Sequence, residues 1–138
     1  MKRFVLIMDY DYKQVGQRFY PLIPVVVVSG ASVYEIHALV DSGSMISLFR
    51  MEVAHQFGIQ PLSGKPINVA SIDGELLVYV HSLCLRIADK EFMCQVGFSE
   101  AFTPHVNILG RIDFFDHFII TFDEKDKKVT LTSYDEST

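Results

Sequence analysis

The sequence lacks the features of several classes of protein. Charged residues make up 21% of it, the net charge is -5, and Asp126 interrupts its one short basic stretch, 125–128. This balance gives no electrostatic footprint for nucleic acid. No window approaches the roughly 18 to 20 consecutive apolar residues that a membrane-spanning helix needs. We therefore expect neither nucleic acid nor a membrane among its partners.

Metal-binding and targeting motifs are also missing. Two cysteines form no metal motif, and five histidines are scattered without HxxxH or HxH spacing, so we expect no metal site. The N-terminal stretch MKRFVLIMDYDY begins like a signal peptide, but its apolar run is five residues long and ends in acids. The location that we expect is therefore the cytoplasm.

What the chain does contain is the composition of a packed globular protein. It is 49% hydrophobic, with 11 Phe and 6 Tyr. Its 138 residues suffice for one domain with a sizeable core and not for two full ones. No linker or internal repeat divides it. We expect a single domain over 1–138, with a core at about 18–134 and a frayed tail at 135–138.

Most of the chain alternates, or runs in short apolar blocks broken by Gly, Pro, Asp and Asn, which predicts many short strands. The expected strands are 3–8, 18–30, 33–40 and 106–109, and the expected hairpins are 25–28 with 33–40 and 118–123 with 128–134. One stretch, RMEVAHQFGI (50–59), predicts a helix that ends at Gly58. A helical turn is expected at 111–116.

Two further hairpins are predicted from their turns. Asp73-Gly74 is the strongest short hairpin signal in the chain, and a turn there pairs Val69 with Val78. This pairing makes a long two-stranded arm.

The second turn is expected at Asp89-Lys90, where it pairs Leu85 with Cys94. Cys84 then lies on the opposite face from Cys94, because adjacent strand positions alternate sides. A disulfide between them is disfavoured, which agrees with a reducing compartment.

The stretch ALVDSGSMISLF (38–49) carries the strongest chemical signal. An apolar run ends in Asp41, followed by Ser42-Gly43-Ser44, and apolar character then resumes. Alone, the triplet Asp-Ser-Gly is weak, because these are common turn residues. A second signal, NILGR (107–111), lies downstream, after the Asp-Gly hairpin.

This ordered set resembles the retropepsin-like aspartic proteases, the single-domain relatives of pepsin, over about 18–134. It looks more like the cellular and prokaryotic members than the viral ones, because a helix follows the active-site loop. The resemblance implies a mostly β fold: an acid-protease barrel with one helix after the active-site loop and a short helix after the Ile-Leu-Gly-Arg turn. It also implies an aspartic endopeptidase without a metal or organic cofactor.

The resemblance implies a role for each matched residue. Asp41 would be the catalytic carboxylate, and Ser42 would hydrogen-bond across to a partner loop. Gly43 would let the backbone approach substrate closely, and Ser44 would pack beside the site. The flap tip that closes over a bound peptide would be Ile72, Asp73, Gly74 and Glu75. Support for the loop would come from Ile108, Leu109 and Gly110, with Arg111 in a structural role.

Aspartic proteolysis needs two carboxylates that share one proton. The chain has one Asp-Ser/Thr-Gly, and its other acids lie in predicted turn or surface contexts. If the protein is active, two chains must meet with Asp41 facing Asp41, as a homodimer that binds a peptide or protein substrate. The alternative is a non-catalytic peptide-binding or dimerisation module on the same fold.

Two departures from the family pattern leave questions open. Many viral members have an acid at the position of Met45, where it can pair with the Arg of Gly-Arg, so the partner of Arg111 is open. Met45 and Ile46 would either line a substrate pocket or pack under the loop. Viral dimers interleave their termini, whereas the longer N-terminal strand and acidic tail here suggest a different interface.

Overall fold

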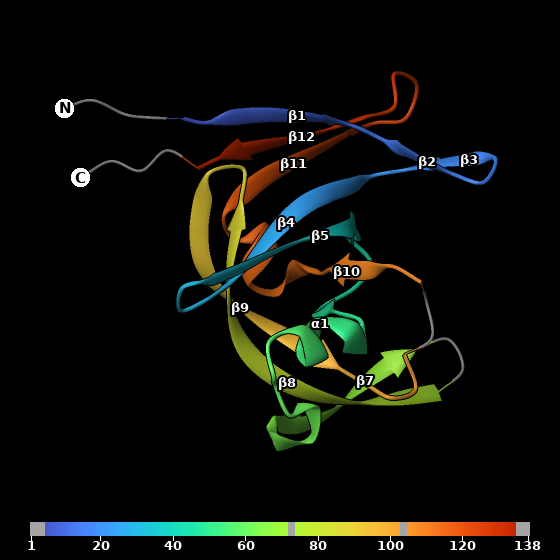
Figure 1. Cartoon of the computed structure of the whole chain (residues 1–138). Helices are drawn as coiled ribbons and strands as arrows, with labels where there is room; N and C mark the ends of the chain where they lie inside the picture. The colour runs from blue at the N-terminus through green and yellow to red at the C-terminus, as the bar shows by residue number, and fades with distance from the viewer. Residues whose placement is uncertain (1–4, 72–73, 103–104, 135–138) are drawn as a thin grey trace.

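The structure is a computed structural model that describes residues 5–71, 74–102 and 105–134 (Figure 1). As predicted, the fold is mostly β. The strands are β1 (Ile7–Asp11), β2 (Lys13–Val15), β3 (Arg18–Tyr20), β4 (Leu22–Ser29), β5 (Ser32–Val40), β6 (Ser47–Leu48), β7 (Lys65–Ser71), β8 (Gly74–Ile87), β9 (Lys90–Phe98), β10 (Asn107–Leu109), β11 (Phe118–Asp123) and β12 (Lys128–Ser133). The helical segments are α1 (Met51–Gln56) and the short turns Pro61–Ser63 and Arg111–Phe115.

Six strands close into a barrel in the order β4-β5-β10-β6-β9-β8, and β8 pairs back to β4. Strand β8 is 14 residues long, so it serves both the barrel and, with β7, an arm that extends from it. A separate three-stranded sheet, in the order β1-β12-β11, lies beside the barrel, and the β2–β3 hairpin projects from the body (Figure 1).

The core fills the barrel with alternate residues of its strands. Val25 and Val27 of β4 are 0% and 1% exposed, and the residue between them is half-buried. Leu85, Cys94 and Val96 meet them from β8 and β9 in the same cluster. Burying one such aliphatic side chain contributes about 1.5–3 kcal/mol. These buried side chains hold the barrel together.

The predicted arm is present, but the predicted register differs from the observed one by two residues. Val69 pairs with Leu76 instead of Val78, and Ser71 pairs with Gly74. Residues 72 and 73, between that last pair, lie outside the described part of the chain. Because side chains alternate with a period of two, a shift of two keeps each one on its predicted face.

The second hairpin shows the same shift. Leu85 pairs with Phe92 instead of Cys94, and the two residues outside the ladder are Ala88 and Asp89. Both have positive φ, 49° and 63°, as the tight two-residue turn that suits twisted strands requires. The sequence shows no glycine here, so composition alone did not place the turn.

The cysteines lie on opposite faces, as predicted, and both are free. Burial raises the pKa of the Cys94 thiol to about 12. The Cys84 thiol lies 3.5 Å from Glu91 Oε1; desolvation and this acidic neighbour raise its pKa. Neither thiol is an activated nucleophile.

Two predicted elements need correction at their ends. The first strand was expected at 3–8, but β1 runs from Ile7 to Asp11, because Met8 and Tyr10 alternate onto the core. The helical turn at 111–116 is distorted: Ile112 is extended and Asp113 has φ 70°. The Asp113 carboxylate accepts a 2.7 Å hydrogen bond from Gln95 N–H, which holds this geometry.

The one regular helix, α1, is shorter than predicted. It ends near Gly58, whose φ of 65° confirms the predicted stop. Within the ranges that the structure describes, no helix is both long and apolar enough to cross a membrane.

Candidate active site

Asp41 stands where two parallel strands end together. Strand β10 pairs in parallel with β5, so that Leu109 lies opposite Val40. The Asp41 N–H then donates to the Leu109 carbonyl at 3.0 Å. Val40 is 4% exposed and anchors the residue before it in the core. The backbone of Asp41 is therefore fixed, and the residue as a whole is half-buried.

The loop after Asp41 is organised by the carboxylate itself. Asp41 Oδ1 accepts a hydrogen bond from Gly43 N–H at 2.9 Å, and Ser44 N–H donates to the Asp41 carbonyl at 3.2 Å. This pattern is an Asx-type turn. Ser42 and Gly43 are exposed at its tip, so the predicted loop residues are brought together around one carboxylate.

The end of β10 and the two residues after it, Gly110 and Arg111, lie against this loop. Gly110 packs so closely that an added Cβ would lie 2.5 Å from the Ile46 carbonyl and 2.9 Å from Ser44 O. Arg111 N–H donates to Ser44 O at 2.8 Å. Ile108 pairs with Leu39 of β5 and with Leu48 of β6.

Two buried polar residues that the sequence reasoning missed tie the site together. Ser47 is 0% exposed, and its hydroxyl accepts the Gly110 N–H at 3.0 Å. Asn107 accepts from Arg50 N–H at 2.8 Å and donates to the His37 carbonyl at 3.1 Å. In the sequence, each is a polar residue inside a short apolar run. Because burying a polar group without hydrogen bonds is costly, such a residue indicates a buried hydrogen-bond partner.

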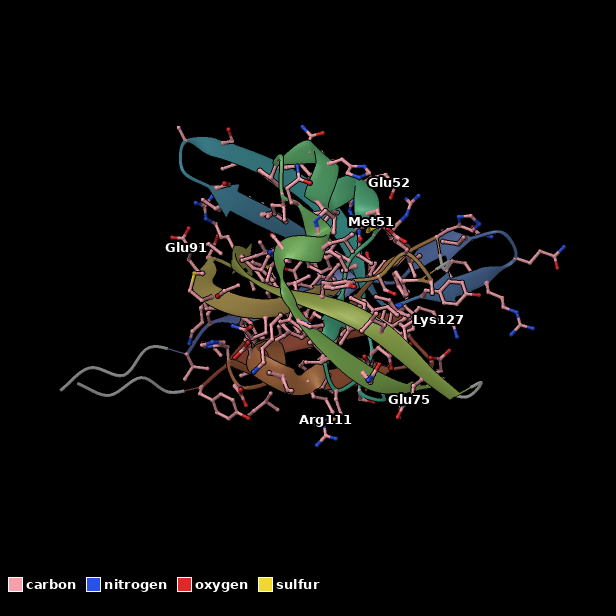
Figure 2. The ribbon with its side chains drawn as sticks, turned by 90° about the horizontal axis from the view of Figure 1, so that it is seen from below. Met51, Glu52, Glu75, Glu91, Arg111 and Lys127 are labelled. Carbon is pink, nitrogen blue, oxygen red and sulfur yellow. The ribbon has the colours of Figure 1, made fainter. Side chains whose placement is uncertain are left out.

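The structure shows what the Arg111 side chain contacts in place of an acid. Its guanidinium Nη1 lies 3.5 Å from Met45 Sδ, and among the described residues it has no carboxylate partner. Figure 2 shows its side chain pointing away from the barrel. Met45 is 53% exposed, so core packing is wrong for it, whereas Ile46 is buried with Leu48 and Val78.

The candidate flap is the arm of β7 and β8. Gly74 has φ 124° and Glu75 pairs with Ala70, while Ile72 and Asp73 lie outside the described residues. The base of the arm is firmly packed: Val78 is 0% exposed. A Cβ at Gly97 would lie only 2.1 Å from Val78 Cγ1, so β9 and β8 are in close contact here.

The other acids near the site have local structural partners. Asp113 accepts from Gln95 N–H, and Asp116 accepts from Asp113 N–H at 3.2 Å. No group of three or more His, Cys, Asp or Glu side chains in the described ranges could hold a metal ion. Among the described acids near this loop, Asp41 is the one that lies at the ends of the paired strands β5 and β10.

Comparison with known proteins yields structural neighbours alone. No family model and no curated protein sequence matches the chain. A crystal structure of a retropepsin-like aspartic protease from Rickettsia conorii is similar over 99% of this chain and 98% of its own, with a TM-score of 0.69 and 19% identity. EIAV protease complexed with the inhibitor HBY-793 is similar over 72% of this chain and 88% of its own, with a TM-score of 0.53 and 14% identity. The fold is therefore retropepsin-like, as the sequence predicted.

Proposed function

We propose that the protein is an aspartic endopeptidase that acts as a homodimer, with Asp41 of each subunit forming the catalytic dyad. The observation that carries the proposal is the placement of Asp41 in a retropepsin-like fold. The ends of β5 and β10 fix its backbone, and its carboxylate organises an exposed Ser-Gly loop. Both structural neighbours are described as proteases.

In the proposed reaction the two Asp41 carboxylates share one proton, because like charges so close cannot both ionise easily. The ionised carboxylate takes a proton from a water molecule, whose oxygen attacks the carbonyl carbon of the scissile peptide bond. The protonated carboxyl donates its proton to the carbonyl oxygen. Collapse of the tetrahedral intermediate breaks the C–N bond. The leaving amine takes the proton that the first carboxylate removed from water, and a hydroxyl of the intermediate returns its proton to the other carboxylate.

The substrate in this proposal is an extended peptide, which bonds through its backbone and places alternate side chains in pockets. The arm of β7 and β8, with a tip at 72–75, would close over it, and Ser42 would hydrogen-bond across to the partner loop. No metal or organic cofactor enters the reaction. We propose a cytoplasmic location, which the two free cysteines support.

The test is the replacement Asp41→Asn, assayed on peptide-library cleavage. We expect cleavage to fall by about 10²–10⁴-fold or more, the usual scale for loss of a general acid–base group. Thermal unfolding and dimerisation should be unchanged, since an amide oxygen can still accept from Gly43 N–H. The matched control is Asp89→Asn at an exposed turn with φ 63°, which Asn tolerates.

Full cleavage by the Asp41→Asn protein would refute the proposal. A wild-type dimer that binds peptides and cleaves none of them would instead identify the non-catalytic binding module.

A further inference from the structure

We propose that the two copies meet at an apolar loop patch, formed by Met45 and Ile112 with Arg111 beside them. In this dimer the terminal strands β1 and β12 stay paired within their own chain. The inference rests on the proposed homodimer and specifies its interface.

The two apolar members of the loop patch are large and exposed. Met45 is 53% exposed and Ile112 is 41% exposed. They are held side by side, because Ile112 N–H donates to the Met45 carbonyl at 2.8 Å. Met45 lies two residues after Gly43, so the patch is continuous with the exposed Ser42-Gly43 tip. A second copy that brings its Asp41 to this loop would therefore also cover the patch.

Arg111 gives the patch a charge suited to burial between subunits. Its guanidinium contacts Met45 Sδ at 3.5 Å and has no carboxylate partner in the described ranges. Guanidinium is weakly hydrated and is favoured at interfaces. Figure 2 shows Arg111 and Glu75 on the same side of the molecule. A two-fold contact on this side can therefore place opposite charges across the interface.

The terminal strands, by contrast, are already satisfied in their own chain. β1 and β12 pair from Ile7 opposite Thr132 to Asp11 opposite Lys128. Beyond the strand, Leu6 N–H donates to Ser133 Oγ at 2.8 Å and Leu6 O accepts from Ser133 N–H at 2.8 Å. Exchange of these strands between copies would only re-form the same pairs between two chains, so the β1–β12 ladder is complete without it.

The interface is tested by sedimentation velocity over a range of protein concentrations. Met45→Lys and Ile112→Lys place a charge in the patch, and we expect each to raise the dimer Kd by at least about tenfold. Val33→Lys is the matched control, since Val33 is 62% exposed on the β4–β5 hairpin. It should dimerise like the wild type. Circular dichroism confirms that each variant is folded, and Met45→Ala, which adds no charge, should weaken the dimer in the same direction.

The outcomes separate this inference from the proposed function. A monomeric wild type at high concentration would overturn the homodimer itself. A wild-type dimer that Met45→Lys and Ile112→Lys leave intact would overturn the loop patch, while the proposed function would stand.

Strand pairing within one chain has its own test. Asp9 and Thr130 are cross-strand partners, and their side chains meet at 2.6 Å. Asp9→Cys with Thr130→Cys, in a Cys84→Ser background, should oxidise to a disulfide within one chain. The protein should then run as a monomer on a denaturing, non-reducing gel. A covalent dimer on that gel would show exchange of the strands and overturn the inference.

Discussion

A side chain at position 110 would occupy space that the loop after Asp41 already fills. The atoms that a Cβ would meet are backbone atoms of Ile46 and Ser44, at 2.5–2.9 Å. The φ of Gly110 is -97°, an ordinary value for any residue. The need for glycine here is therefore steric, and it concerns the loop that carries Asp41.

We predict that Gly110→Ala destabilises the protein by roughly 1–3 kcal/mol, the usual cost of overpacking. Because the displaced atoms belong to residues 44–46, peptide cleavage should fall by more than the loss of folded protein explains. Urea unfolding and kcat/KM, measured below the unfolding transition, separate the two effects. An alanine variant with wild-type stability and wild-type cleavage would contradict the prediction.

At the scale of elements, the sequence predicted the face of each side chain in the hairpins correctly and the register of the strands incorrectly. Alternation along β7, β8 and β9 predicted which face each side chain occupies. Register depends on which two residues make the turn, and both predicted turns lay too near the C-terminus. At Ala88-Asp89, positive φ is adopted by residues with a Cβ, so no glycine signalled it. The position of this turn is known only from the pairing of Ile87 with Lys90.

Positive φ in two hairpin turns therefore predicts opposite effects of substitution. Gly30, in the β4–β5 turn, has φ 58° with no atom within 4 Å of an added Cβ. Gly30→Ala should lower the free energy of unfolding by about 1 kcal/mol, through backbone strain alone. Asp89 has φ 63°, so Asp89→Gly should raise it by a few tenths to about 1 kcal/mol.

Urea unfolding of both variants at one pH checks this pair. If Asp89→Gly is destabilised as much as Gly30→Ala, the carboxylate of Asp89 outweighs its backbone strain, and the argument from φ fails.

At the scale of the whole molecule, the order of motifs predicted the fold better than any single motif did. The strand into Asp41, the arm and the strand into Gly110 predicted a retropepsin-like barrel. The closure of β8 onto β4 and the pairing of β1 with β12 were not predicted. The hydrogen bond from Leu6 N–H to Ser133 spans 127 residues, and no local pattern reports such a contact. Ser47 and Asn107 each stand out as a polar residue in an apolar run, but no local pattern identifies their partners, which are 57 to 70 residues away.

The whole-molecule prediction concerns the number of chains in one active site. Ile7 lies opposite Thr132, so β1 begins beside the end of β12, and a long Gly/Ser linker can join two copies in tandem. Under the proposed function, the specific activity of this tandem protein should not fall on dilution, because the second copy is always present at high effective concentration.

Asp41→Asn in one half of the tandem protein should lower the cleavage rate by about 10²-fold or more, because the remaining carboxylate has no partner. Asp89→Asn in one half is the control and should leave cleavage unchanged. The assay follows one fluorogenic peptide at several protein concentrations, with size measured in parallel to exclude pairing between tandem molecules. Half of the wild-type activity in the Asp41→Asn tandem would mean that each chain carries a complete site. A single Asp41 in the setting of β5 and β10 would then be sufficient for cleavage, and the shared dyad would be wrong.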